Sequence, residues 1–135
     1  MKKRIYIAGP MTGKPDLNRP AFVAAEKRLT AQGHFVINPH RISELFGTAK
    51  ELAESFADFY FVEDQNRLNR FYEASREIER RITLARAVMD VDLAAVRSCD
   101  AIYILRGWES SRGAKKELAE ALEHGLEIMQ EGGTP

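Results

Sequence analysis

Short runs of β-branched and aromatic residues alternate along this chain with longer stretches of helical periodicity. The runs typical of buried strands are residues 4–8, 34–37 and 101–105, with a shorter one at 126–128. The stretches with apolar residues at helical spacing are residues 18–31, most of 41–97 and 111–125. Because strands that alternate with helices form parallel sheets covered on both faces, the sequence predicts an α/β fold. We expect a three-layer, flavodoxin-like or Rossmann-like parallel sheet flanked by helices, with a helical insertion between the second and third strands.

Size and charge exclude several classes of protein. The chain has 135 residues, so we expect 1–135 to form a single domain. Lys and Arg number 20 and so do Asp and Glu, which gives no basic field for a nucleic-acid polymer or a membrane surface. The one cysteine, Cys99, excludes an intrachain disulfide and indicates a reducing, cytoplasmic setting. The histidines lack the paired spacing of a zinc site, so we expect no metal.

The loops after the predicted strands are the expected place for a ligand, because parallel sheets bind ligands beyond the carboxyl ends of their strands. These loops are residues 9–14, 38–40 and 106–113. The first differs from a phosphate loop in its glycine spacing and has Pro15 where a Mg²⁺-binding hydroxyl would stand, which argues against an NTPase. Gly9 and Gly13 either make a plain turn or allow the backbone to approach a ligand closely.

One carboxylate falls on a stripe of apolar residues in the helix before the third strand. The stripe consists of Ile82, Ala85, Met89, Leu93 and Val96. Asp92 lies within this stripe, whereas Asp90 lies outside it. A buried carboxylate costs several kcal/mol unless it has partners. Asp92 is therefore either a functional group or a structural one that bonds a neighbouring backbone.

A second carboxylate, Glu117, lies on the border of the sheet-facing side of the last helix. The residues predicted to face the sheet are Ala114, Leu118, Ala121, Leu122 and Gly125. Glu120 and Glu123 are expected to point outward. The helix dipole would favour the ionised form of Glu117, and partial burial would oppose it. Ser110 and Ser111 are candidate N-caps of this helix, whose amides could instead hold an anion.

Aromatic residues concentrate in the predicted insertion, at Phe56, Phe59, Tyr60, Phe61, Phe71 and Tyr72. They indicate either core packing of a helical hairpin or an oligomer contact or lid over the loops.

Together these pieces resemble the nucleoside 2-deoxyribosyltransferase superfamily, most closely its small branch from phage and bacterial genomes. The matching motifs are Tyr6-Ile-Ala-Gly-Pro-Met11, Gly33-His-Phe-Val-Ile-Asn-Pro39, Asp92 with Asp100, Cys99-Asp-Ala-Ile-Tyr103, and Gly107-Trp-Glu-Ser-Ser-Arg-Gly113 followed by Glu117. They cover both ends of the chain and leave about residues 41–85 unmatched.

The resemblance implies chemistry at the N-glycosidic bond of a 2′-deoxynucleoside or 2′-deoxynucleotide, by transfer or by hydrolysis, without a cofactor. It implies that Glu117 attacks C1′ to form a covalent deoxyribosyl-enzyme, that Asp92 positions the sugar and manages the proton of the departing base, and that Tyr6 holds the nucleophile. It also implies a homo-oligomer whose ligand is a small nucleoside or nucleotide. The alternative is a non-catalytic binding module of the same fold. The expected substrate contacts are Gly9, Pro10, Met11, Thr12, Asn38, Trp108, Ser110, Ser111, Arg112 and Gly113.

The chain departs from this pattern in its first loop. Related deoxynucleotide hydrolases carry a serine where this chain has Pro10, which weakens the case for 5′-phosphate recognition. Side chains that could substitute are Thr12, Ser110, Ser111 and Arg112. Trp108 either stacks on a base or covers the end of the sheet.

Overall fold

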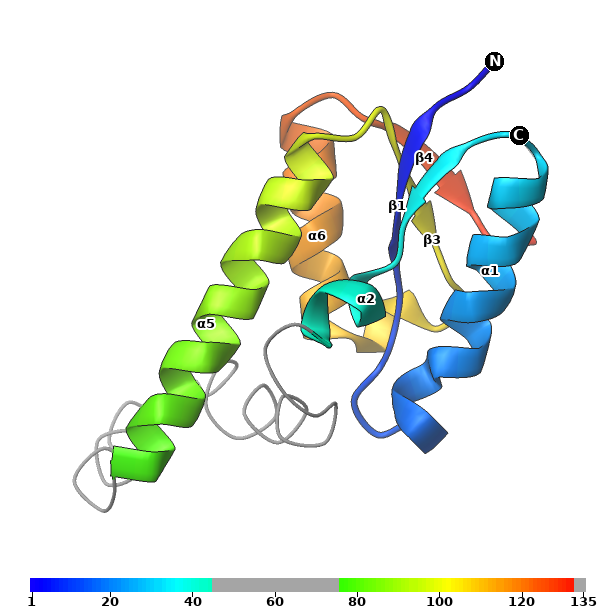
Figure 1. Cartoon of the computed structure of the whole chain (residues 1–135). Coiled ribbons are helices and arrows are strands. Elements are labelled where there is room, and N and C mark those ends of the chain that lie inside the picture. The colour runs from blue at the N-terminus through cyan, green and yellow to red at the C-terminus, as the bar shows by residue number, and fades with distance from the viewer. Residues whose placement is uncertain (45–75, 133–135) are drawn as a thin grey trace.

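The computed structural model describes residues 1–44 and 76–132, and for residues 76–85 the backbone only. The described residues form a sheet of four parallel strands (Figure 1) in the order β2-β1-β3-β4. These strands are β1 (Arg4–Ala8), β2 (Phe35–Ile37), β3 (Ala101–Ile104) and β4 (Glu127–Gln130). The predicted parallel α/β fold is confirmed, and β4 lies slightly later in the chain than expected.

Helices cover both faces of this sheet, which gives the predicted three layers (Figure 1). The helix α1 (Arg19–Ala31) covers one face, and the helices α5 (Arg76–Arg97) and α6 (Arg112–Glu123) cover the other. The central strand β1 supplies both cores, because its side chains alternate between the two faces. Ile5 and Ile7 pack with α1, whereas Tyr6 and Ala8 pack on the opposite side.

In the described part of the chain, three short helical elements lie in the loops at the carboxyl edge of the sheet. They are the 3-10 turns η1 (Pro15–Asn18) and η3 (Trp108–Ser110) and the short helix α2 (Pro39–Ser43). The two 3-10 turns were not predicted, since they are too short for apolar periodicity to reveal. Asn18, expected to be helical, instead has a φ of 60°, and Asp16 and Leu17 also have positive φ. The expected helical insertion is present as α2 and α5, and residues 45–75 lie outside the described part.

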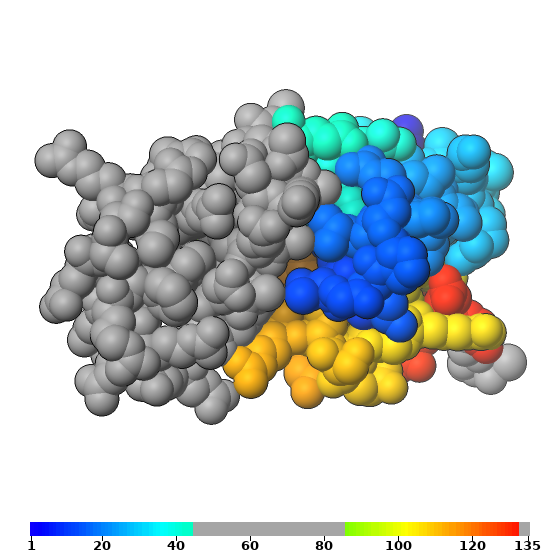
Figure 2. All heavy atoms as spheres, turned by 90° about the horizontal axis from the view of Figure 1, so that it is seen from below, coloured from blue at the N-terminus to red at the C-terminus, as the bar shows by residue number. Residues whose placement is uncertain are grey.

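The loops that follow the strands meet at one edge of the sheet, as predicted. Figure 2 views this edge, with the first loop in blue beside the η3 region in orange. A Cβ on Gly107 would lie 3.4 Å from Cγ of Pro10, so the first and third loops touch. The helix α2 packs against both β1 and α5.

Gly9 is required by packing rather than by a turn. A Cβ there would lie 2.7 Å from Cβ of Leu105, which no real contact allows. The space beside Gly9 is thus taken by the residue that follows β3. Gly13, with a φ of 83° and open space around it, fits the turn interpretation.

Within the described ranges, no helix has the length and apolar character needed to cross a membrane.

Candidate active site

Tyr6 and Glu117 form a buried hydrogen bond across the sheet–helix interface. Tyr6 extends from the middle of β1 toward α6, and its hydroxyl donates to Oε2 of Glu117. Glu117 lies in the second turn of α6 and is 6% exposed, so the border position expected from the sequence is in fact interior. The resemblance paired these two residues, and the structure brings them together.

Asp92 reaches the same interface from α5. It is 6% exposed and shares the buried face of α5 with Val88, Met89 and Val96. Its Oδ1 atom has no hydrogen-bond partner. The prediction of a carboxylate on a buried stripe is confirmed. The capping role considered for Asp92 does not account for this oxygen.

Burial sets the electrostatics of these carboxyls. It raises the pKa of Asp92 from 3.8 to about 8. The pKa of Glu117 is raised well above its ordinary value, first by burial and then by the charge of Asp92, while the hydrogen bond from Tyr6 lowers it. The pKa of Tyr6 is raised well above 10.0 by burial and by both carboxylates, so its hydroxyl stays a donor.

Burial therefore favours the protonated forms of both carboxyls near neutral pH. Two neighbouring carboxyls in a poorly solvated site repel each other when charged, so they do not both ionise near neutral pH. The hydrogen bond from Tyr6 favours the ionised form of Glu117 and so partly offsets the effects of burial and of Asp92 on its pKa. The helix dipole considered for Glu117 has less influence, since its effect fades within the first turn.

The third loop begins α6 with a side-chain cap. Ser111 is the N-cap residue, and its Oγ accepts from the backbone N–H of Ala114 at 3.1 Å. Ser110 instead donates its Oγ–H to the carbonyl of Gly107 at 2.9 Å. Of the two candidate caps, Ser111 is therefore the one used. Arg112 is exposed in the first turn and Gly113 is half-buried.

The remaining expected substrate contacts differ in exposure. Pro10 is buried, Met11 is half-buried against the core on the α1 face, and Thr12 is exposed. Trp108 is half-buried and packs against the core on the α5/α6 face. Its two proposed roles, stacking on a base and covering the end of the sheet, both stay predictions.

Asn38 and His40 flank the start of α2 and are each 1% exposed. Oδ1 of Asn38 caps α2 by accepting from the backbone N–H of His40 at 3.0 Å. The imidazole packs edge-on against Phe22, with ring centroids 4.8 Å apart. We did not predict a role for His40, because Asn38-Pro39 marks only the end of a strand. The signal that could have found it is a histidine directly after a helix-starting Asn-Pro.

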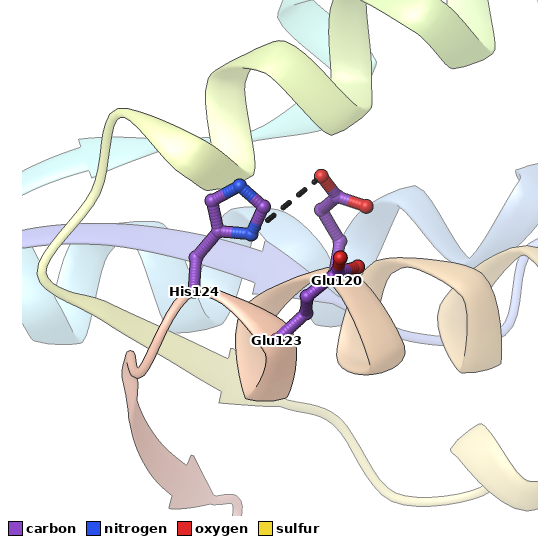
Figure 3. A group of neighbouring side chains, drawn as sticks. All are labelled: Glu120, Glu123 and His124. Carbon is purple, nitrogen blue, oxygen red and sulfur yellow. Dashed lines mark ion pairs between the residues drawn. The ribbon is translucent and has the colours of Figure 1, made fainter.

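One cluster of possible metal ligands lies away from this site, in the described part of the chain. Glu120, Glu123 and His124 gather at the carboxyl end of α6 (Figure 3), with ligand atoms within 4.8 Å of one another. Glu120 already accepts a hydrogen bond from Arg97 at 2.8 Å and lies 3.8 Å from Nδ1 of His124. We therefore interpret the cluster as a link between α5 and α6.

Some sequence expectations for α6 are wrong. Leu122 was expected to face the sheet but is 61% exposed, and Gly125 is exposed too. Both lie at the carboxyl end of α6, where the buried face ends at Ala121. Glu120, expected to point into water, is half-buried beside Arg97. The aromatic residues of 56–72 lie outside the described part, so the homo-oligomer stays a prediction.

The fold and the site define a parallel α/β protein with a buried Tyr–Glu–Asp group on one face of its sheet. A family model described as "Domain of unknown function (DUF4406)" matches residues 3–58 and 57–130, so the chain belongs to this family. A search of curated proteins and of solved structures finds no match to the chain.

Proposed function

We propose that this protein cleaves or transfers at the N-glycosidic bond of a 2′-deoxynucleoside or 2′-deoxynucleotide, through a covalent deoxyribosyl-Glu117 intermediate. The observation that carries the proposal is the buried hydrogen bond from Tyr6 to Glu117 beside the buried, incompletely bonded Asp92. In this proposal the reacting form has Glu117 ionised, with its charge stabilised by the hydrogen bond from Tyr6, and Asp92 protonated, an arrangement that suits attack on an oxocarbenium-like carbon.

Each carboxyl has a distinct role in this proposal. In the first step an oxygen of Glu117 forms a bond to C1′ while the bond from C1′ to the base nitrogen breaks, and the electron pair leaves with the base. Protonated Asp92 donates its proton to that base. In the second step an acceptor base or water displaces Glu117 from C1′ and returns a proton to Asp92. Tyr6 orients Glu117 by hydrogen bonding and takes part in no proton transfer.

The proposal predicts a large effect of Glu117→Gln. The amide is a far weaker nucleophile, so turnover should fall by about three orders of magnitude or more. The matched control is Glu123→Gln, the same change on an exposed position of the same helix, which should leave turnover unchanged. The measurement is base exchange and hydrolysis, followed by chromatography, across the common deoxynucleosides and their 5′-monophosphates.

A trapping experiment locates the nucleophile directly. A 2′-fluoro-2′-deoxynucleoside slows departure of the glycosyl group, so an adduct should accumulate and be mapped to Glu117 by mass spectrometry. An adduct on Glu109 or Asp92 would contradict the assignment. Binding of deoxynucleosides without turnover would instead favour the non-catalytic binding module.

A further inference from the structure

The described part of the chain contains three buried side-chain atoms without a hydrogen-bond partner, and all lie on elements that pack together. They are Oδ1 of Asp92, Nδ2 of Asn38 and Nε2 of His40. The first belongs to the carboxyl pair described above. The other two belong to the start of α2, which packs against β1 and α5, the elements that carry Tyr6 and Asp92.

The two atoms on α2 have defined hydrogen-bonding characters. The cap bond fixes the oxygen of the Asn38 amide toward the backbone N–H of His40, so the free end, Nδ2, is a donor. His40 has its pKa lowered to about 4, mainly by burial and then by Arg19, which keeps the imidazole neutral. A hydrogen bond with the backbone of Leu17 acts in the opposite direction, as an imidazole N–H that donates to a carbonyl does. Because Nε2 has no partner, that bond is made by Nδ1, and Nε2 is left as an acceptor.

Leaving both atoms unbonded is costly for the fold alone. A buried polar atom without a partner costs about 1–3 kcal/mol, and native proteins contain few such atoms. The cap bond orients the amide of Asn38, and packing against Phe22 orients the ring of His40. Atoms that are desolvated and oriented in advance are favourable partners for a ligand group that completes their bonding.

We propose that Nδ2 of Asn38 and Nε2 of His40 form a neutral donor–acceptor subsite that binds an uncharged hydrogen-bonding group of the nucleoside. This inference rests on the proposed function. The group must accept from Asn38 and donate to His40, which a sugar hydroxyl or the polar edge of a base can do. A phosphate does not suit the subsite, since the lone pair of Nε2 would face an anion. Arg19, the nearby cation, is engaged with Glu44 at 2.7 Å.

Binding measurements on the full chain with Glu117→Gln test the subsite without turnover. The probes are the four common 2′-deoxynucleosides, titrated by calorimetry. Asn38→Asp keeps the capping oxygen and removes the donor, and His40→Phe keeps a ring against Phe22 and removes both nitrogens. Each should weaken binding about tenfold to hundredfold. His40→Gln, which restores an acceptor, should recover most of the affinity. Asn18→Asp, the same chemical change at the half-buried end of η1, should have no effect.

Analogues of the tightest-binding nucleoside identify the group that is held. They lack the 3′-hydroxyl, the 5′-hydroxyl or the exocyclic polar group of the base. The analogue that lacks the contacted group should bind weakly to the Glu117→Gln protein. Adding Asn38→Asp to that protein should then weaken binding of this analogue no further. This result distinguishes a sugar hydroxyl from a base edge.

A spectroscopic readout keeps the proposal testable even if the variants fold poorly. In the ¹⁵N-histidine spectrum of the parent, the Nε2 resonance of His40 should move when the nucleoside binds. An unmoved resonance, or folded variants that bind like the parent, would mean that the atoms hold a buried water only and would overturn the subsite.

These outcomes separate the subsite from the reaction. If Asn38→Asp turns over substrate with an unchanged KM, the subsite proposal is wrong and the proposed function still stands. If the protein shows no turnover but binds nucleosides in a way that depends on Asn38 and His40, the subsite is supported and the proposed function is wrong. If no probe binds and the His40 resonance does not move, both proposals fail.

Discussion

The two faces of the sheet are built from the same strands but hold different chemistry. On the face under α1, Ile5 and Ile7 meet Phe22, Ala25 and Leu29, an apolar core. On the opposite face, β1 contributes Tyr6, which meets Glu117 from α6 beside Asp92 from α5. One side of the molecule therefore gains stability from burial. The α5/α6 face is less stabilised by burial, because it keeps ionisable groups out of water.

This difference follows from alternation along a single strand. Neighbouring residues of β1 point to opposite faces of the sheet. The hydroxyl of Tyr6 can therefore enter one core without changing the packing of the other core. Hydrophobic burial contributes roughly 1.5–3 kcal/mol for a large apolar side chain, whereas a buried carboxyl lowers stability when it ionises. The α1 face should therefore respond to loss of volume and the α5/α6 face to change of charge.

The largest expected effect on stability is that of Phe22→Ala on the α1 face. Phe22 is fully buried between β1 and His40, and removing its ring should lower the free energy of unfolding by about 3–5 kcal/mol. Urea denaturation measures this. A loss of less than about 1 kcal/mol would mean that the α1 face does not carry the core assigned to it.

Asp92→Asn should have the opposite signature on the other face. Turnover should fall about a hundredfold or more, because the proton donor is lost. Stability should stay the same or rise, and depend less on pH than in the parent. Turnover assays and thermal melts between pH 5 and pH 9 check both. Lower stability with unchanged turnover per folded molecule would make Asp92 a structural residue.

The direction of that pH dependence follows from the raised pKa of Asp92. Folding lifts it from 3.8 to about 8, so the folded state holds the proton more tightly than the unfolded state. The contribution of Asp92 to stability should be fully present below about pH 4 and be lost as the pH rises from about 4 to 8. Glu117 acts in the same direction, because its pKa is also raised.

The smallest expected effect concerns the ion pair that joins α5 to α6 outside the site. Glu120→Ala removes the contact with Arg97, whose side chain is 44% exposed, so the loss should be about 0.2–1 kcal/mol. Turnover should be unchanged, as should the pH dependence of the thermal melts. An effect on turnover as large as that of Asp92→Asn would extend the functional face to this end of α6.

Local pattern was enough to predict the strands, the layers and the position of Asp92. Helical spacing places Asp92 on the same face of the helix as the apolar residues Met89 and Val96, and the structure buries all three. Leu122 shows where that reasoning fails. Helical phasing assigns it to the sheet side, but only tertiary packing decides where along a helix the covered surface ends.

The sequence by itself determined which residues alternate along β1, and hence that Tyr6 and Ile7 face opposite layers. Strand and helix patterns did not show that the hydroxyl of Tyr6 reaches a carboxylate 111 positions away, which only the family resemblance implied. Nor did these patterns show that Asn38 and His40 keep buried atoms without partners. Strand and helix periods are local properties of the backbone. The partner and the solvation of a buried polar atom depend on every element packed around it, so only the tertiary structure decided them.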